Sequence, residues 1–181
     1  DSLVLDIEKI GHGKNEISLI DVGTGAGFTG LPLKIAHPQL NVVLLDSLNK
    51  RVKFLNQVID DLGLTEIEAI HSRAEDGGRN KEFREHFDVS VSRAVANLAT
   101  LVEYNLPFVK VGGYFVAYKS GDIDEELVNA KKAVSVLGGT IEEVKKFKLP
   151  GTDIDRSLVY IKKVKPTSGK FPRKAGLPSK E

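Results

Sequence analysis

The feature that most constrains the fold is a glycine-rich stretch, Asp21-Val22-Gly23-Thr24-Gly25-Ala26-Gly27-Phe28-Thr29-Gly30. An apolar run over 17–22 precedes it, and a second apolar run over 31–36 follows it. The first run is typical of a buried strand and the second of a short helix. Four glycines in eight positions (23–30) indicate a turn that something approaches closely, because glycine has no Cβ and tolerates positive φ. The stretch therefore predicts the first strand–turn–helix unit of a nucleotide-type α/β domain.

The same alternation continues along the chain. We expect strands over 17–22, 41–45, 66–70, 87–91 and 113–118, helices over 30–36, 49–62, 98–109 and 125–137, and two last strands over 140–148 and 157–163. Strands that alternate with helices form a mostly parallel sheet with helices on both faces. The last two strands have no helix between them, so we expect a C-terminal antiparallel hairpin. The fold class is α/β, with a seven-stranded sheet whose ligand lies beyond the strand ends.

The composition limits the possible classes of protein. The 181 residues fit one domain with a substantial core. The chain has no cysteine, which excludes disulfides and thiolate sites and fits a cytoplasmic location. Its four histidines show no metal-ligand spacing, and no apolar run is long enough to cross a membrane, so we expect neither a metal nor a membrane partner. The abrupt amphipathic start at Asp1 suggests that an N-terminal helical part has been lost.

The C-terminal end is strongly basic. Residues 162–181 carry seven basic side chains and one acidic one, so the rest of the chain is mildly acidic. We divide the chain into a domain over 1–164 and a basic Pro/Gly-rich tail over 165–181. Cations interleaved with an aromatic residue suggest a polyanionic partner such as RNA, with Lys170, Arg173 and Lys174 as candidate contacts. A solvated, frayed terminus is the alternative.

The ligand of the glycine-rich turn can be narrowed from its flanking residues. Residues 25–30 satisfy the pattern G-x-G-x-x-G, and Asp46 follows about twenty residues later, as in folds that bind a dinucleotide. However, Asp21 places an acid at the strand end, where a pyrophosphate is disfavoured. A cationic ligand without phosphate, S-adenosyl-L-methionine, fits this acidic turn better. An NAD-binding oxidoreductase remains the alternative.

Residues after the later strands extend the candidate site. Asp46 can accept hydrogen bonds from both ribose hydroxyls, although Asp46 or Ser47 could instead cap the next helix. Glu75 lies where such folds meet the adenine, and a capping role is equally natural. Arg93 could meet the carboxylate of the ligand or an RNA phosphate.

Five segments together resemble one known family, the bacterial small-subunit ribosomal RNA methyltransferase G family, also called glucose-inhibited division protein B. These segments are 21–33, 44–51 (Leu-Leu-Asp-Ser-Leu-Asn-Lys-Arg), 73–75, 93–96 and 170–180. The resemblance implies a Rossmann-like class I S-adenosylmethionine-dependent methyltransferase that modifies a guanine N7 in 16S ribosomal RNA. Its partner would be that RNA or the small ribosomal subunit. Thr29, Ser168 and Phe171 depart from the residues that are usual in the family.

The resemblance also implies the site residues. The cofactor contacts would be Gly23, Phe28, Asp46, Ser47, Leu48, Ala74, Glu75 and Arg93. Guanine N7 has an exposed lone pair and carries no proton at neutral pH, so we name no catalytic residue. We expect removal of the tail to abolish RNA methylation and to spare cofactor binding. A non-catalytic RNA-binding module with a degenerate methyltransferase fold is the rival from another class.

Overall fold

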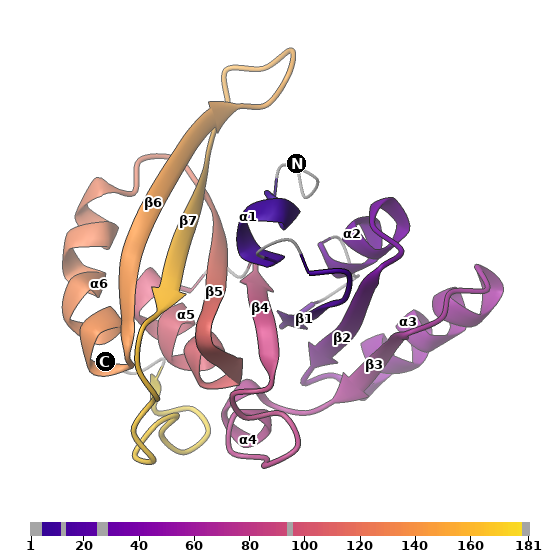
Figure 1. Ribbon diagram of the computed structural model, residues 1–181. Coiled ribbons are helices and arrows are strands. Elements are labelled where there is room, and N and C mark those ends of the chain that lie inside the picture. The colour runs from indigo at the N-terminus through magenta and orange to yellow at the C-terminus, as the bar shows by residue number, and fades with distance from the viewer. Residues whose placement is uncertain (1–4, 12–13, 25–28, 94–95, 179–181) are drawn as a thin grey trace.

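A computed structural model describes residues 5–11, 14–24, 29–93 and 96–178. Within them, one seven-stranded sheet with the order β3-β2-β1-β4-β5-β7-β6 forms the centre of the molecule (Figure 1). The strands are β1 (Ile17–Val22), β2 (Leu40–Asp46), β3 (Ile67–His71), β4 (Phe87–Ser92), β5 (Val109–Ser120), β6 (Gly139–Lys148) and β7 (Asp155–Lys163). The helices are α1 (Ile7–Gly11), α2 (Gly30–Ala36), α3 (Asn49–Asp61), α4 (Ala74–Gly77), α5 (Leu98–Asn105) and α6 (Asp124–Val136), with a 3₁₀ turn, η2 (Leu106–Phe108).

The pairing of the strands confirms the expected sheet. Strands β1 to β5 pair in parallel, and β7 runs antiparallel to both β5 and β6. The strand order reverses at β1, which pairs with β2 on one side and with β4 on the other. Ligands of open α/β sheets bind beyond the carboxyl ends of the strands at such a reversal. The topology therefore places a candidate site where the glycine-rich turn leaves β1.

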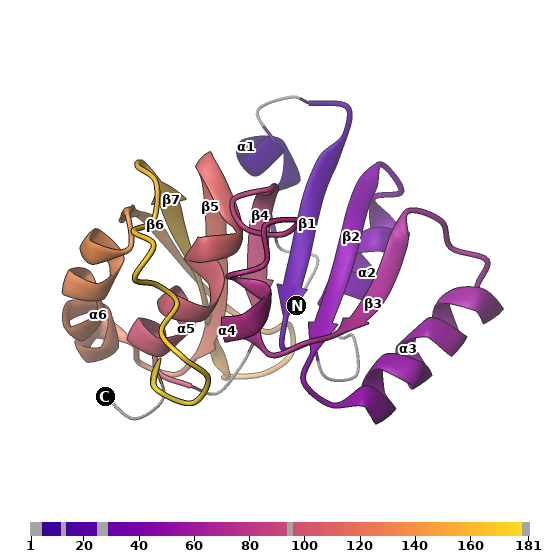
Figure 2. The same cartoon turned by 90° about the horizontal axis from the view of Figure 1, so that it is seen from below.

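Helices cover both faces of the sheet, as Figures 1 and 2 show. One core cluster joins α1, α2 and α3 to the sheet and includes Leu33, Leu44 and Leu55. A second cluster joins α5 and α6 to β5 and β7, with Leu101 and Phe115 among its members. Because each helix buries one apolar side against the sheet, the alternation in the sequence leads directly to three layers. No helix among the described residues is long and apolar enough to cross a membrane.

The expected helix over 98–109 is too long at its C-terminal end. Helix α5 ends at Asn105, a 3₁₀ turn that contains Pro107 follows, and β5 already begins at Val109. Proline cannot donate the backbone hydrogen bond that a continuing helix requires. The short helices α1 and α4 were not expected as elements, because segments of five and four residues show too little periodicity.

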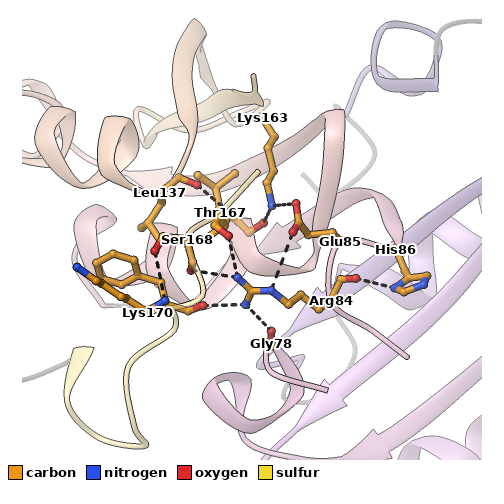
Figure 3. Close-up of polar contacts among 11 residues, drawn as sticks. Gly78, Arg84, Glu85, His86, Leu137, Lys163, Thr167, Ser168 and Lys170 are labelled. Atoms are coloured by element: carbon orange, nitrogen blue, oxygen red, sulfur yellow. Dashed lines mark hydrogen bonds and ion pairs between the residues drawn. The ribbon is translucent and has the colours of Figure 1, made fainter. Parts of the chain in front are cut away.

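After β7 the chain turns back across the helices on one face. Residues 164–178, here called the C-terminal strap, lie beside α4 and α5 (Figure 2). The guanidinium of Arg84 is central to this arrangement (Figure 3). It donates hydrogen bonds of 2.7–3.1 Å to the carbonyl oxygens of Gly78, Thr167, Ser168 and Phe171. The strap is therefore an ordered part of the fold.

An ion pair with a buried lysine lies at the point where the strap leaves the sheet. Lys163, which has no solvent exposure, donates to the carbonyl of Leu106 at 2.9 Å and lies 3.1 Å from the carboxylate of Glu85. Burial lowers the pKa of the Lys163 ammonium to about 8, although Glu85 opposes that shift. The pair joins β7 to the loop that carries Arg84 (Figure 3).

Candidate functional site

A cleft of about 230 Å³ opens at the carboxyl ends of β1 to β4. The strand ends and the loops after them form most of its wall, and α5 and the C-terminal strap complete it. The lining residues are Val22, Gly23, Leu45, Asp46, Ser47, Ser72, Arg73, Ala74, Glu75, Ser92, Leu101, Tyr104, Asn105 and Gly176. The reversal of strand order and this cleft coincide, so the topology and the surface identify the same site.

Asp21 stabilises the glycine-rich turn from the protein interior. Its side chain is buried, and its Oδ2 accepts hydrogen bonds of 2.9 Å from the Thr24 hydroxyl and from the Gly30 N–H. Burial raises the pKa of the Asp21 carboxyl to about 6, while these hydrogen bonds and the charge of Arg93 act in the opposite direction. Asp21 does not line the cleft, so it fixes where the turn enters α2.

Gly23 has the backbone conformation that the sequence suggested. Its φ is +69°, and a Cβ built there would meet no atom within 4 Å. Glycine is therefore favoured by the left-handed conformation, and the space beside it remains open to a ligand. The Gly23 N–H donates to the Leu45 carbonyl at 2.8 Å, which joins the turn to β2. Phe28, another expected contact, lies outside the described residues.

Asp46 places a buried carboxylate at the end of β2. Its Oδ1 accepts a 2.9 Å hydrogen bond from the Leu48 N–H, and its Oδ2 lies 3.7 Å from Nη1 of Arg51. Leu48 is the N-cap of α3 and makes no side-chain capping hydrogen bond, so neither Asp46 nor Ser47 is the N-cap residue of that helix. Leu48 does not line the cleft, and its backbone instead orients Asp46.

Ala74 and Glu75 begin α4 and also line the cleft. The N-cap of this helix is Arg73, without a side-chain hydrogen bond, so Glu75 is not its capping residue. The Glu75 side chain is buried, and its Oε2 accepts a 2.7 Å hydrogen bond from the N–H of Gly176 in the strap. The expected adenine-side residue is thus also the residue that holds the strap against the cleft.

Arg93 lies just beyond the end of β4 and does not line the main cleft. Its guanidinium lies over the Tyr118 ring, 5.8 Å from the ring centre. A smaller polar hollow surrounds it. That hollow is lined by Arg93, Tyr118, Lys119, Ser120, Arg156 and Ser157. Two more cations therefore accompany Arg93 at the edge where β5 ends and β7 begins.

Several lining residues escaped the sequence interpretation. Leu101, Tyr104 and Asn105 belong to α5, whose apolar spacing resembles an ordinary core helix. Asn105 is fully buried, and it accepts a hydrogen bond from the Ser90 hydroxyl and donates one to the Leu101 carbonyl at 2.8 Å. An asparagine within an apolar helix was the available signal. Gly176 carried no comparable signal.

The three basic residues expected to contact RNA differ in their surroundings. Lys170 and Lys174 are exposed. Arg173 is half-buried, and its guanidinium lies 2.8 Å from Oε1 of the buried Glu103. The backbone N–H of Arg173 also donates to Oε2 of Glu103 at 2.8 Å. Arg173 therefore has a structural partner within the protein.

Comparison with known proteins identifies the family. Residues 1–159 match the family described as GidB, rRNA small subunit methyltransferase G. The chain belongs to this family. The ribosomal RNA small subunit methyltransferase G of Lachnoclostridium phytofermentans is 57% identical over 163 residues, which are 90% of this chain and 67% of that protein. The corresponding protein of Thermoanaerobacter sp. is 54% identical over 94% of this chain and 71% of its own length.

Solved structures confirm the fold of this methyltransferase G family member. A 16S rRNA (adenine(1408)-N(1))-methyltransferase variant from Catenulisporales acidiphilia superposes with a TM-score of 0.71 at 18% identity, covering 91% of this chain and 94% of that one. The same variant with its cosubstrate SAM gives a TM-score of 0.70. The expected family and the class I methyltransferase fold are both confirmed.

Proposed function

We propose that the chain transfers a methyl group from S-adenosyl-L-methionine to N7 of a guanine in 16S ribosomal RNA. The observation that carries the proposal is the buried Asp46 carboxylate at the end of β2, which lines the cleft beside the open turn at Gly23. Family membership supplies the reaction and the RNA. The methyl transfer would take place in the cytoplasm, where small ribosomal subunits assemble.

The cleft suits the chemistry of this cofactor. Asp46 can accept hydrogen bonds from ribose hydroxyls, and Ser47, Ala74 and Glu75 line the adjoining surface. Asp46 suits the ribose of either cofactor, but the buried carboxylate of Glu75 in the lining would repel the pyrophosphate of a dinucleotide. A ligand that carries an ammonium and a sulfonium but no phosphate meets no such repulsion. The dinucleotide alternative is therefore disfavoured by the charges in the wall.

Cations on the strap and in the hollow around Arg93 support RNA as the substrate. Lys170 and Lys174 project from the strap, while Arg93 and Arg156 line the hollow beyond β4 and β5. Phosphate groups bind such side chains with release of counterions, so the affinity for RNA should fall with salt. A guanine presented between these two groups of cations would reach the cleft from its open side.

The reaction requires little proton transfer by the protein. Guanine N7 attacks the methyl carbon through its lone pair, the carbon–sulfur bond breaks, and the electron pair remains on sulfur. No proton has to leave N7 before the attack, so the protein contributes by holding donor and acceptor in line. Asp46 and the backbone at Gly23 would position the cofactor for that purpose.

A methylation assay tests the proposal. The protein is incubated with methyl-labelled S-adenosylmethionine and either naked 16S ribosomal RNA or small ribosomal subunits, and the modified base is identified by nucleoside analysis. We expect labelled 7-methylguanine, and an Asp46→Ala variant should lose most of it. Binding of RNA without any affinity for the cofactor would instead indicate a non-catalytic RNA-binding module. Stabilisation by NAD and not by S-adenosylmethionine in a thermal shift assay would indicate an oxidoreductase.

A further inference from the structure

The C-terminal strap is anchored to the body of the protein along its whole length. Thr167 donates its hydroxyl to the carbonyl of Leu137 at 2.7 Å, close to the carbonyls that Arg84 holds. Near the other end, the hydroxyl of Thr100 donates to the carbonyl of Pro178 at 3.0 Å. The residues between these points pass directly over α4 and α5. A segment held at both ends in this way has a defined docked position.

Two buried carboxylates hold the central part of the docked strap. Glu75 accepts the N–H of Gly176, and Glu103 accepts the N–H and the guanidinium of Arg173. The residues Glu75 and Glu103 are only 6% and 5% exposed in the docked arrangement. A buried carboxylate that loses its partner is strongly unfavourable, so departure of the strap would require both groups to regain water.

The strap also forms part of the cleft wall. Gly176 and Glu75 both line the cleft, and the N–H of Gly176 donates its hydrogen bond to the carboxylate of Glu75. Glu103 is outside the lining, although its helix also carries Leu101, Tyr104 and Asn105, which are part of it. Undocking of the strap would therefore remove Gly176 from the cleft wall and take away the hydrogen bond that Gly176 gives to Glu75.

We propose that the docking of the strap and the binding of the cofactor stabilise each other, with Glu75, Glu103 and Arg84 as positioning residues. The cofactor in the cleft would favour the docked strap, and the docked strap would raise the affinity for the cofactor. Such coupling is reciprocal, because each binding event changes the other by the same factor. The inference rests on the proposed cofactor, and it replaces the expectation that the tail can be removed without effect on cofactor binding.

The exposed lysines of the strap connect this coupling to the binding of RNA. Lys170 and Lys174 lie on the strap and are exposed while its backbone is docked. RNA that binds both lysines in the docked arrangement would favour the same state as the cofactor. The segment that binds the RNA would thus also respond to the presence of the cofactor in the cleft.

Limited proteolysis of the full chain tests the coupling. Trypsin can cleave after Lys174 in the strap and after Lys148, the last residue of β6, which does not line the cleft and serves as the internal control. With S-adenosylhomocysteine at about 100 times its dissociation constant, we expect cleavage after Lys174 to slow at least about 5-fold. Cleavage after Lys148 should keep its rate. Equal rates at Lys174 with and without the ligand would overturn the inference.

Substitutions away from the cleft provide a second test. Glu103→Ala removes the hydrogen bonds from the backbone N–H and from the guanidinium of Arg173, whereas Glu103→Gln keeps an oxygen for the backbone N–H. We expect S-adenosylhomocysteine to bind about 10-fold more weakly to the alanine variant and about 3-fold more weakly to the glutamine variant, by calorimetry. Glu68→Gln on the exposed side of β3 is the matched control and should leave the affinity unchanged.

The outcomes separate the two proposals. If the unaltered protein does not bind S-adenosylhomocysteine, the proposed function fails. If the unaltered protein binds the ligand and both Glu103 variants bind it with the same affinity as the unaltered protein, the proposed function is retained and the coupling is refuted. Should the alanine variant fail to fold, the proteolysis of the unaltered protein still decides the question.

Discussion

The backbone N–H of Gly30 donates a 2.9 Å hydrogen bond to Oδ2 of Asp21, the same oxygen that accepts the hydroxyl of Thr24. One buried carboxylate oxygen therefore fixes both ends of the glycine-rich turn. The arrangement explains why an acid occupies the second-last position of β1, directly before the turn. It also makes the turn sensitive to the protonation of a single group.

Replacement of Asp21 by asparagine should change the dependence of stability on pH. Burial raises the pKa of Asp21 from an ordinary value of 3.8 to about 6, so the folded state binds this proton more tightly than the unfolded state does. The stability from this group is complete below about pH 4 and is lost as the pH rises through about 6, by up to about 3 kcal/mol. In Asp21→Asn, one amide oxygen can still accept both hydrogen bonds.

Urea denaturation of both proteins between pH 4 and 7 measures this effect. The free energy of unfolding of Asp21→Asn, minus that of the unaltered protein, should increase with pH across this range. Parallel pH profiles for the two proteins would show that Asp21 titrates in the same way folded and unfolded.

Replacement of Asp46 by alanine should weaken the binding of S-adenosylmethionine. Hydrogen bonds to a charged group contribute about 1.5–3 kcal/mol each, so a loss of about 2 kcal/mol, or about 30-fold in affinity, is expected. Calorimetry measures the affinity, and Asp60→Ala on the exposed side of α3 is the control. Unchanged binding by Asp46→Ala would remove Asp46 from the cofactor site.

Replacement of Gly30 by alanine should destabilise the fold. A Cβ at this position would lie 2.3 Å from Cδ2 of Leu44 and 3.1 Å from Oδ2 of Asp21. Leu44 is fully buried and cannot move aside without disturbing the core, so we expect a loss of about 1–3 kcal/mol in urea denaturation. Gly169→Ala is the matched control, because a Cβ there meets nothing within 4 Å. A Gly30→Ala protein as stable as this control would contradict the close approach of α2 to β2.

Neutralisation of Lys170 and Lys174 to glutamine should reduce the salt dependence of RNA binding. Each phosphate contact that is lost lowers the slope of log affinity against log salt by about 0.7–0.9. The double variant should thus lose about 1.5 from that slope in filter binding with 16S ribosomal RNA. Lys145→Gln together with Lys148→Gln, both exposed on β6, provides a variant of equal charge. The same slope in both double variants would exclude the strap as an RNA contact.

The sequence predicted the architecture well, because period and length determine strands and helices. The prediction was less accurate where elements are very short, as for α4, and where Pro107 ends α5. The strand-end residues Gly23 and Asp46 were predictable, since the chain order of a parallel sheet brings them to one edge. Their neighbour Gly176 was not. It reaches the cleft through a backbone N–H bonded to a residue 101 positions earlier, and no pattern of side chains encodes such a contact.

The contacts of Arg84 have one more consequence. Its guanidinium binds the strap only through main-chain oxygens, those of Thr167, Ser168 and Phe171. Every amino acid offers the same oxygen, so this grip is indifferent to which residues occupy the three positions. The hydrogen bonds from Arg84 would therefore survive a change at the exposed Ser168, whereas Phe171 also packs its ring against the core beside α5 and α6. Arg84 thus holds this part of the strap by its main chain, and the side chain at position 168 is left open to evolutionary change.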